Sequence, residues 1–320
     1  MASDVPALFA ASLVIDQRKA AEAHLEALAG QKGFLPHLLQ IVLDRSQPMQ
    51  VRQAACLYFK NQIKQRWDDV SVVLERLKFS DQMCLSPQEE TPIPTQDKAT
   101  IRENLVASMV NLSDPSDKLV RTQVGETVAA VARTDFPDSW PDLVSRLVST
   151  LSPTDYTINL SVLQTAHNVF APWKSEIRSD RLYSTINLAL SHFVDPYFAL
   201  FRATASHVIS LDTVDASALA LLGDSMDILF SLYYDLTAQD LPPAFEDAHD
   251  EFFGNEKEEG WLLKFLRWDP PSLRSDVSSL DIVFGLFLIV CSAIRLFPYR
   301  PDANPNYNIG DMRTVYPTVQ

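Results

Sequence analysis

The sequence from residue 48 to residue 67 reads PMQVRQAACLYFKNQIKQRW. Its apolar side chains recur every fourth residue, so they share one face of a predicted helix. They are Ala55, Phe59, Ile63 and Trp67. A polar front on another side of the helix carries Gln53, Lys60, Asn61 and Lys64. Such a helix needs neighbours that cover its apolar back, and we expect its front to be free to meet a partner.

The composition favours an all-α fold. The chain has 320 residues, of which only 8 are glycine, well below the usual ~7%. It contains no Asn-Gly or Asp-Gly pair of the kind that marks a hairpin, so an antiparallel sheet is not expected. The 20 prolines fall between the periodic segments, as expected of many short helices.

Charge, cysteines and motifs argue against several classes of function. The formal net charge of −14 repels nucleic acid and favours basic protein partners. Cys56, Cys84 and Cys291 are isolated from one another, which argues against a disulfide framework or a zinc site. The sequence has no HExxH, GxxxxGK[ST], GxSxG or GxGxxG. We therefore expect no catalytic residue, no metal site and no cofactor.

Apolar periodicity predicts helices along most of the chain. They cover residues 5–15, 17–29, 34–44, 48–67, 97–112, 116–134 and about 155–171, 175–193, 196–211 and 215–236. Residues 80–95 contain three prolines and are predicted to form an exposed loop. The segment DFPDSWPDL, residues 135–143, is expected to be a tight corner whose aromatic side chains pack onto the next repeat.

An arginine recurs near the start of several of these helices, at Arg18, Arg52, Arg121 and Arg202. Each is predicted to be the second residue of a later helix, and the steps between them are 34, 69 and 81 residues. We interpret the two longer steps as double periods. Helix pairs at such intervals are typical of HEAT and armadillo repeats of ~40–47 residues. Because one pair cannot bury its own apolar stripe, we predict an α-solenoid of stacked HEAT repeats, a superhelical arch, over residues 1–275.

Residues 51–67, VRQAACLYFKNQIKQRW, resemble the N-terminal signature of the importin-β (karyopherin) family, and residues 135–143 resemble the matching element one repeat later. The structural signature consists of Arg18, Arg52, Ala55, Phe59, Ile63, Trp67, Arg121, Phe136, Pro137, Trp140 and Pro141. Four later segments resemble the importin-α re-exporter branch of the family, in its fungal form. They are residues 162–177, 203–219, 231–247 and 258–270.

The resemblance implies a domain organisation. Residues 1–150 correspond to an importin N-terminal domain, and residues 151–275 to the start of the repeats specific to the re-exporter branch. The likeness is expected to end near Ser275, and residues 276–320 are expected to be disordered or a gene-model artefact of a truncated chain. The 13-residue apolar run from Ile282 to Ile294 is shorter than the ~20 residues that a spanning helix needs, so no stable membrane insertion is expected.

The resemblance also implies a function. A receptor of this kind binds Ran in its GTP form through its N-terminal repeats, takes importin-α as cargo, and shuttles between nucleus and cytoplasm with transient residence at the nuclear envelope. Nucleoporins are further candidate partners, and nucleic acid is not expected to bind. The residues assigned to Ran are those of the polar front: Gln53, Lys60, Asn61 and Lys64.

Other interpretations of the same residues remain open. The polar front is also what an ordinary solvated helix face looks like. A HEAT-repeat scaffold that assembles other protein complexes would show the same helix pairs without any role in transport. A membrane-tethered helical protein is a third hypothesis, and it depends on the apolar run of residues 282–297 alone.

Overall fold

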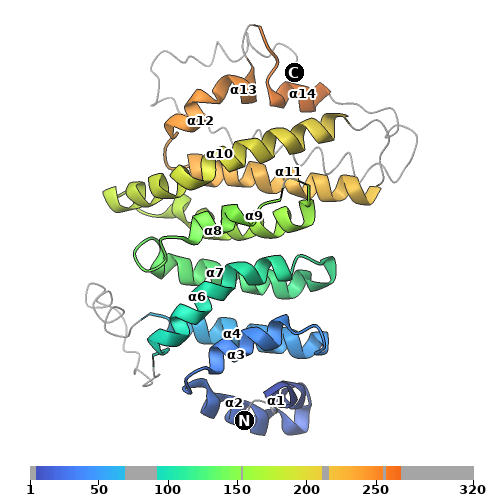
Figure 1. Ribbon diagram of the computed structural model, residues 1–320, viewed down its shortest axis with the longest axis vertical. Helices are drawn as coiled ribbons and strands as arrows, with labels where there is room; N and C mark the ends of the chain where they lie inside the picture. Colours follow the sequence, from blue (N-terminus) through green and yellow to red (C-terminus); the bar gives the residue numbers. More distant parts are fainter. Residues whose placement is uncertain (1–4, 69–91, 153, 211–215, 255–256, 268–320) are drawn as a thin grey trace.

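The computed structural model describes residues 5–68, 92–152, 154–210, 216–254 and 257–267. Within these ranges every regular element is a helix, apart from one isolated β-bridge between Gly254 and Glu259. The helices stack along the long axis of the molecule, with the N-terminal pair at one end and the last described helices at the other (Figure 1).

Five antiparallel helix pairs make up most of the described chain. They are α1 (Val5–Ser12) with α2 (Ile15–Ala29), α3 (Phe34–Leu43) with α4 (Met49–Arg66), α6 (Thr95–Asn111) with α7 (Lys118–Asp135), α8 (Leu143–Ser149) with α9 (Tyr156–Phe170), and α10 (Asp180–Ser210) with α11 (Ala216–Thr237). Short 3-10 turns occupy Pro115–Asp117 and Ala171–Ser175. Three short helices follow: α12 (Pro243–Asp247), α13 (His249–Phe253) and α14 (Trp261–Arg267).

The pairs are arranged in two layers. From the second pair onward, the second helices α4, α7, α9 and α11 pack on one another in sequence order, and the first helices α3, α6, α8 and α10 do the same in the other layer. Each pair therefore covers the apolar faces of the pairs before and after it. The predicted all-α solenoid is confirmed.

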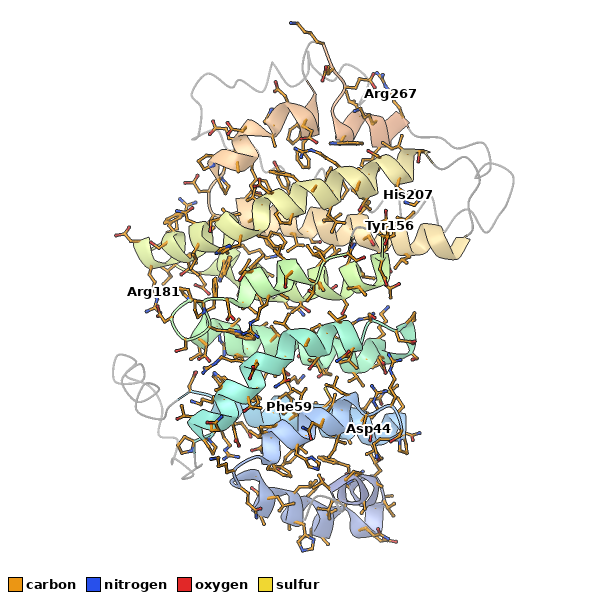
Figure 2. The ribbon with its side chains drawn as sticks, viewed as in Figure 1. Asp44, Phe59, Tyr156, Arg181, His207 and Arg267 are labelled. Carbon is orange, nitrogen blue, oxygen red and sulfur yellow. The ribbon has the colours of Figure 1, made fainter. Side chains whose placement is uncertain are left out.

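Side chains fill the space between successive pairs, as Figure 2 shows around Phe59. On α4 the predicted apolar back is confirmed, since Ala55, Phe59 and Ile63 are fully buried and Trp67 is almost so. The valines of α7 that share one face are likewise fully buried: Val120, Val124, Val128 and Val131. The fourfold spacing in the sequence thus identified the surfaces on which the solenoid is built.

The repeated arginine has a structural role at three of its four predicted positions. Arg18, Arg52 and Arg121 are each the fourth residue of a second helix, not the second residue as predicted. Each donates a hydrogen bond to a carbonyl at the end of the preceding helix. The acceptors are Ser12 O at 3.0 Å, Val42 O at 2.8 Å and Leu112 O at 3.0 Å. Since these carbonyls have no partner within their own helix, the arginine ties the two helices of a pair together.

The fourth predicted position is wrong. Arg202 lies far inside α10, where it forms an ion pair with Glu251 at 2.7 Å. The equivalent fourth residue of α9 is Asn159, which donates to Ser152 O at 2.7 Å and accepts from Ser152 N at 2.8 Å. The 69-residue step from Arg52 to Arg121 is also not a double period, because α4 packs directly on α7.

Residues 175–193 and 196–211 do not form two helices as predicted. One helix, α10, runs for 31 residues with Pro196 inside it. A proline in a helix interior loses one backbone hydrogen bond and costs about 3 kcal/mol. Burial of the aromatic side chains around the proline offsets that cost, because Phe193, Tyr197 and Phe201 are fully or almost fully buried.

The corner at residues 135–143 is an element of architecture, as predicted. Trp140 and Phe136 are buried, and the Phe136 ring stacks on Trp173 of the next repeat at 6.4 Å between centroids. The aromatic side chains of this corner are therefore used in packing one repeat onto another. The Phe136–Pro137 peptide bond of the corner is cis.

Several predictions lie outside the described residues, namely most of the loop at 80–95 and the whole of the tail at 276–320, including the apolar run at 282–297. In the part of the chain that the structure describes, no helix is both long and apolar enough to cross a membrane. The same part contains no group of three or more His, Cys, Asp or Glu side chains placed to hold a metal ion.

Candidate protein-binding surface

The outward face of α4 is made by side chains that follow one another at helical spacing. Leu57, Asn61 and Lys64 are spaced by four and three residues and are all exposed, Leu57 at 49%. We call these three residues the α4 face. Gln53 and Lys60 lie beside it and are half-buried. The predicted polar front is thus open at Asn61 and Lys64, and it has an apolar side chain at its centre.

Sequence reasoning missed Leu57. The row of Ala55, Phe59 and Ile63 accounts for the buried stripe, and Leu57 falls between its members on the opposite side of the helix. The spacing to Asn61 and Lys64 was the signal that could have identified it. An exposed leucine next to a cationic side chain offers a partner both apolar contact and an ion pair.

Lys60 departs from the expectation of a free front. Its ammonium Nζ lies 2.9 Å from Glu126 Oε2 on α7 and also donates to Gln123 Oε1, and its side chain is only 12% exposed. Lys60 therefore bridges two neighbouring repeats. Its assignment to Ran binding stays a prediction. A partner that contacted Lys60 would have to do so alongside Glu126 and Gln123, which already bind its ammonium group.

Lys64 is more accessible. Its Nζ lies 3.7 Å from the same carboxylate oxygen of Glu126, and its side chain is 48% exposed. The hydrogen bond from Lys60 is the main reason that the pKa of Glu126 lies below its usual value, and the charges of Lys60 and Lys64 act in the same direction. The carboxylate of Glu126 is accordingly ionised at neutral pH and neutralises part of the charge of the two lysines.

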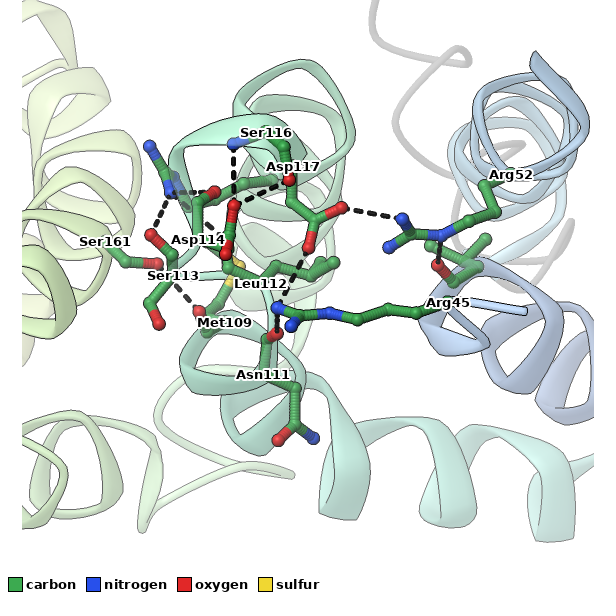
Figure 3. Close-up of polar contacts among 12 residues, drawn as sticks. Arg45, Arg52, Met109, Asn111, Leu112, Ser113, Asp114, Ser116, Asp117 and Ser161 are labelled. Atoms are coloured by element: carbon green, nitrogen blue, oxygen red, sulfur yellow. Dashed lines mark hydrogen bonds and ion pairs between the residues drawn. The ribbon is translucent and has the colours of Figure 1, made fainter. Parts of the chain in front are cut away.

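A buried ion pair holds α4 in register with α7 (Figure 3). Arg52 Nη1 lies 2.7 Å from Asp117 Oδ1, and the two side chains are 4% and 1% exposed. Arg45 Nη2 approaches the other carboxylate oxygen of Asp117 at 3.2 Å from the surface. Asp117 thus joins the second pair to the third at the end where α4 and α7 begin. It fixes the helix that carries the α4 face.

Cys56 makes a further contact across this junction. Its Sγ lies 3.7 Å from Val120 O of α7. Burial raises the pKa of the Cys56 thiol to about 12, so the reactive thiolate is absent at neutral pH. The side chain behaves as a small apolar packing group.

Two family models match the chain. One describes the importin-β N-terminal domain and matches residues 21–111, which include all of α4 and the α4 face. The other describes Cse1 and matches residues 169–312. This second match extends beyond Ser275, where we expected the likeness to end. The division of the solenoid at residue 150 stays a prediction.

Relatives of known name are similar over most of this chain. The importin-α re-exporter of Schizosaccharomyces pombe is 31% identical over 298 residues, which are 93% of this chain and 28% of that protein. The importin-α re-exporter of Saccharomyces cerevisiae is 32% identical over 76% of this chain and 23% of that protein. Exportin-2 of Homo sapiens is 33% identical over 74% of this chain and 22% of that protein. The chain spans less than a third of the length of these relatives.

A solved structure also matches the fold. The exportin Cse1 in its cargo-free, cytoplasmic state superposes with a TM-score of 0.76 and is 27% identical in sequence. The superposition covers 99% of this chain and 30% of that one. The stacked helix pairs described above therefore correspond to part of a longer solenoid.

Proposed function

Since the chain belongs to the importin-β (karyopherin) family, we propose that it acts as a nuclear transport receptor, binding Ran-GTP through its N-terminal repeats and exporting importin-α from the nucleus. The name of its relatives, importin-α re-exporter, supports importin-α as the cargo. Such a receptor shuttles between nucleus and cytoplasm, passing transiently through the nuclear envelope, where nucleoporins would be its further partners.

The observation that carries the Ran assignment is the position of the α4 face inside the importin-β N-terminal match. Leu57, Asn61 and Lys64 offer an apolar group, an amide and a cation within two turns of one rigid helix. An acidic or polar surface of Ran is the partner that complements this face.

Ran-GTP and importin-α are proposed to bind cooperatively. The α4 face is fixed to α7 through Arg52 and Asp117, so a ligand on the face is coupled to the stacking of the repeats. If both partners stabilise the same curvature of the solenoid, each raises the affinity for the other by the same factor. The proposed role is one of binding and release, with no chemical step.

Lys64 is the residue whose charge we expect to matter most for Ran. Lys64→Glu is predicted to weaken binding of Ran-GTP by about tenfold, because it replaces attraction to an acidic surface by repulsion. Affinity is measured by titration with Ran loaded with a non-hydrolysable GTP analogue. Charge reversal at Lys60 is a poorer test, because it would also break the bridge to Glu126 and Gln123.

The matched control for this experiment is Lys32→Glu, which makes the same charge change at an exposed residue in the turn between α2 and α3. It is expected to leave Ran-GTP affinity unchanged. Circular dichroism should show the same helicity in both variants. Equal affinities of the natural chain and the Lys64 variant would remove the α4 face from the Ran site.

A further inference from the structure

Glu126 is a residue of α7 whose carboxylate meets α4 at the edge of the α4 face. Its carboxylate binds Lys60 at 2.9 Å and approaches Lys64 at 3.7 Å, while its side chain is 39% exposed. It is thus the anion that the two lysines meet when no partner is bound. Any partner that offers a carboxylate to Lys64 must share this lysine with Glu126 or displace Glu126.

The solenoid has little need of Glu126 as an anion. Lys60 keeps a second acceptor, Gln123 Oε1, when Glu126 is uncharged. The junction between α4 and α7 is held independently by the buried pair of Arg52 and Asp117 and by the apolar stripe of both helices. Partly exposed ion pairs contribute little to stability. The negative charge of Glu126 therefore affects the net charge of the α4 face more than it affects the stability of the fold.

We propose that Glu126 acts as an internal competitor that lowers the affinity of the α4 face for acidic protein surfaces. With Glu126 ionised, the two lysines and the carboxylate together carry one net positive charge instead of two. Weakly complementary acidic partners are then disfavoured, and a partner that also covers Leu57 and Asn61 is selected. This inference rests on the proposed function, since it concerns how the same face recognises Ran.

The test is Glu126→Gln in the full chain. This change keeps the shape of the side chain and an oxygen that can accept from Lys60, but it removes the charge. We expect Ran loaded with a non-hydrolysable GTP analogue to bind about three- to fivefold more tightly, in line with the strength of partly exposed ion pairs. The gain should shrink at high ionic strength, because salt screens the unmasked lysine.

Two further variants separate charge from packing. Glu103→Gln makes the same change at an exposed residue of α6, in the same repeat but in the opposite helix layer, and should leave the affinity unchanged. Glu126→Asp retains the charge and should bind like the natural chain. An unchanged or weaker affinity of Glu126→Gln would overturn the proposal, as would equal gains in Glu126→Gln and Glu103→Gln.

The outcome also separates this inference from the function beneath it. If Lys64→Glu weakens Ran binding while Glu126→Gln does not tighten it, the Ran site stands and the role of Glu126 as a competitor is wrong. If neither variant changes the affinity, the α4 face is not the Ran site. Tightening in Glu126→Gln that disappears in the double variant with Lys64→Glu would support both.

Discussion

Replacing Asp117 with alanine is expected to lower the free energy of unfolding by about 3–5 kcal/mol. The reason is the guanidinium of Arg52, which would remain charged inside the protein without its 2.7 Å partner. Arg52 Nη2 already has no hydrogen-bond partner among the described residues, so few groups are at hand to replace the lost carboxylate. Urea unfolding followed by circular dichroism measures the loss.

Two further variants test this explanation of the loss. Asp138→Ala removes the partner of Arg181 in an ion pair whose side chains are 73% and 77% exposed, and it should have a much smaller effect. The double variant Arg52→Met with Asp117→Leu replaces both buried charges by apolar groups and should recover part of the loss. Equal effects of Asp117→Ala and Asp138→Ala would show that Arg52 is not confined as the structure indicates.

Phe59→Ala is expected to cost about 3–5 kcal/mol, because it leaves a cavity in the core between stacked pairs. Phe59 is fully buried in the middle of α4. The loss is again measured by urea unfolding. Binding of Ran-GTP is measured without denaturant, at a temperature where the variant remains helical.

Leu57→Ala, two residues earlier on the same helix, is the control. Leu57 is 49% exposed, so its truncation should scarcely change stability but should weaken Ran binding through lost apolar contact. The two variants should therefore separate the buried back of α4 from its outer face. A large loss of stability in Leu57→Ala would mean that the leucine is a core residue and that the α4 face has been misassigned.

The buried stripes could be predicted from the sequence because helical periodicity is local. Ala55, Phe59 and Ile63 belong to one helix, and their spacing alone shows that they share a face. The same holds for the valines of α7. Those residues defined the helix pairs and the need for stacking, which is why the all-α solenoid was predicted correctly.

The contacts between repeats could not be predicted in this way. Lys60 meets Glu126, and Arg52 meets Asp117, across 65 or 66 residues of chain. Their pairing depends on how α4 packs against α7. The number of residues between equivalent helices also differs from one repeat to the next. Lys60 was consequently interpreted as a free contact residue, although most of its side chain is covered.

The register of the repeat was misjudged for a related reason. Arg202 was predicted to lie near the start of a helix, but it lies inside α10, because Pro196 does not divide that helix in two. At the equivalent place in α9 the bond to the preceding turn is made by Asn159, a different residue type. A search for recurring arginine finds Arg202 and overlooks Asn159, because the repeat preserves a hydrogen bond and not a residue type.

The most direct test of the proposed function is the nucleotide dependence of Ran binding to the chain of 320 residues. Affinities for Ran loaded with a non-hydrolysable GTP analogue and for Ran-GDP are measured by titration, each with and without importin-α. We expect the GTP form to bind at least about tenfold more tightly, a difference of ~1.4 kcal/mol. Equal affinities for the two forms, or no binding of either, would contradict it.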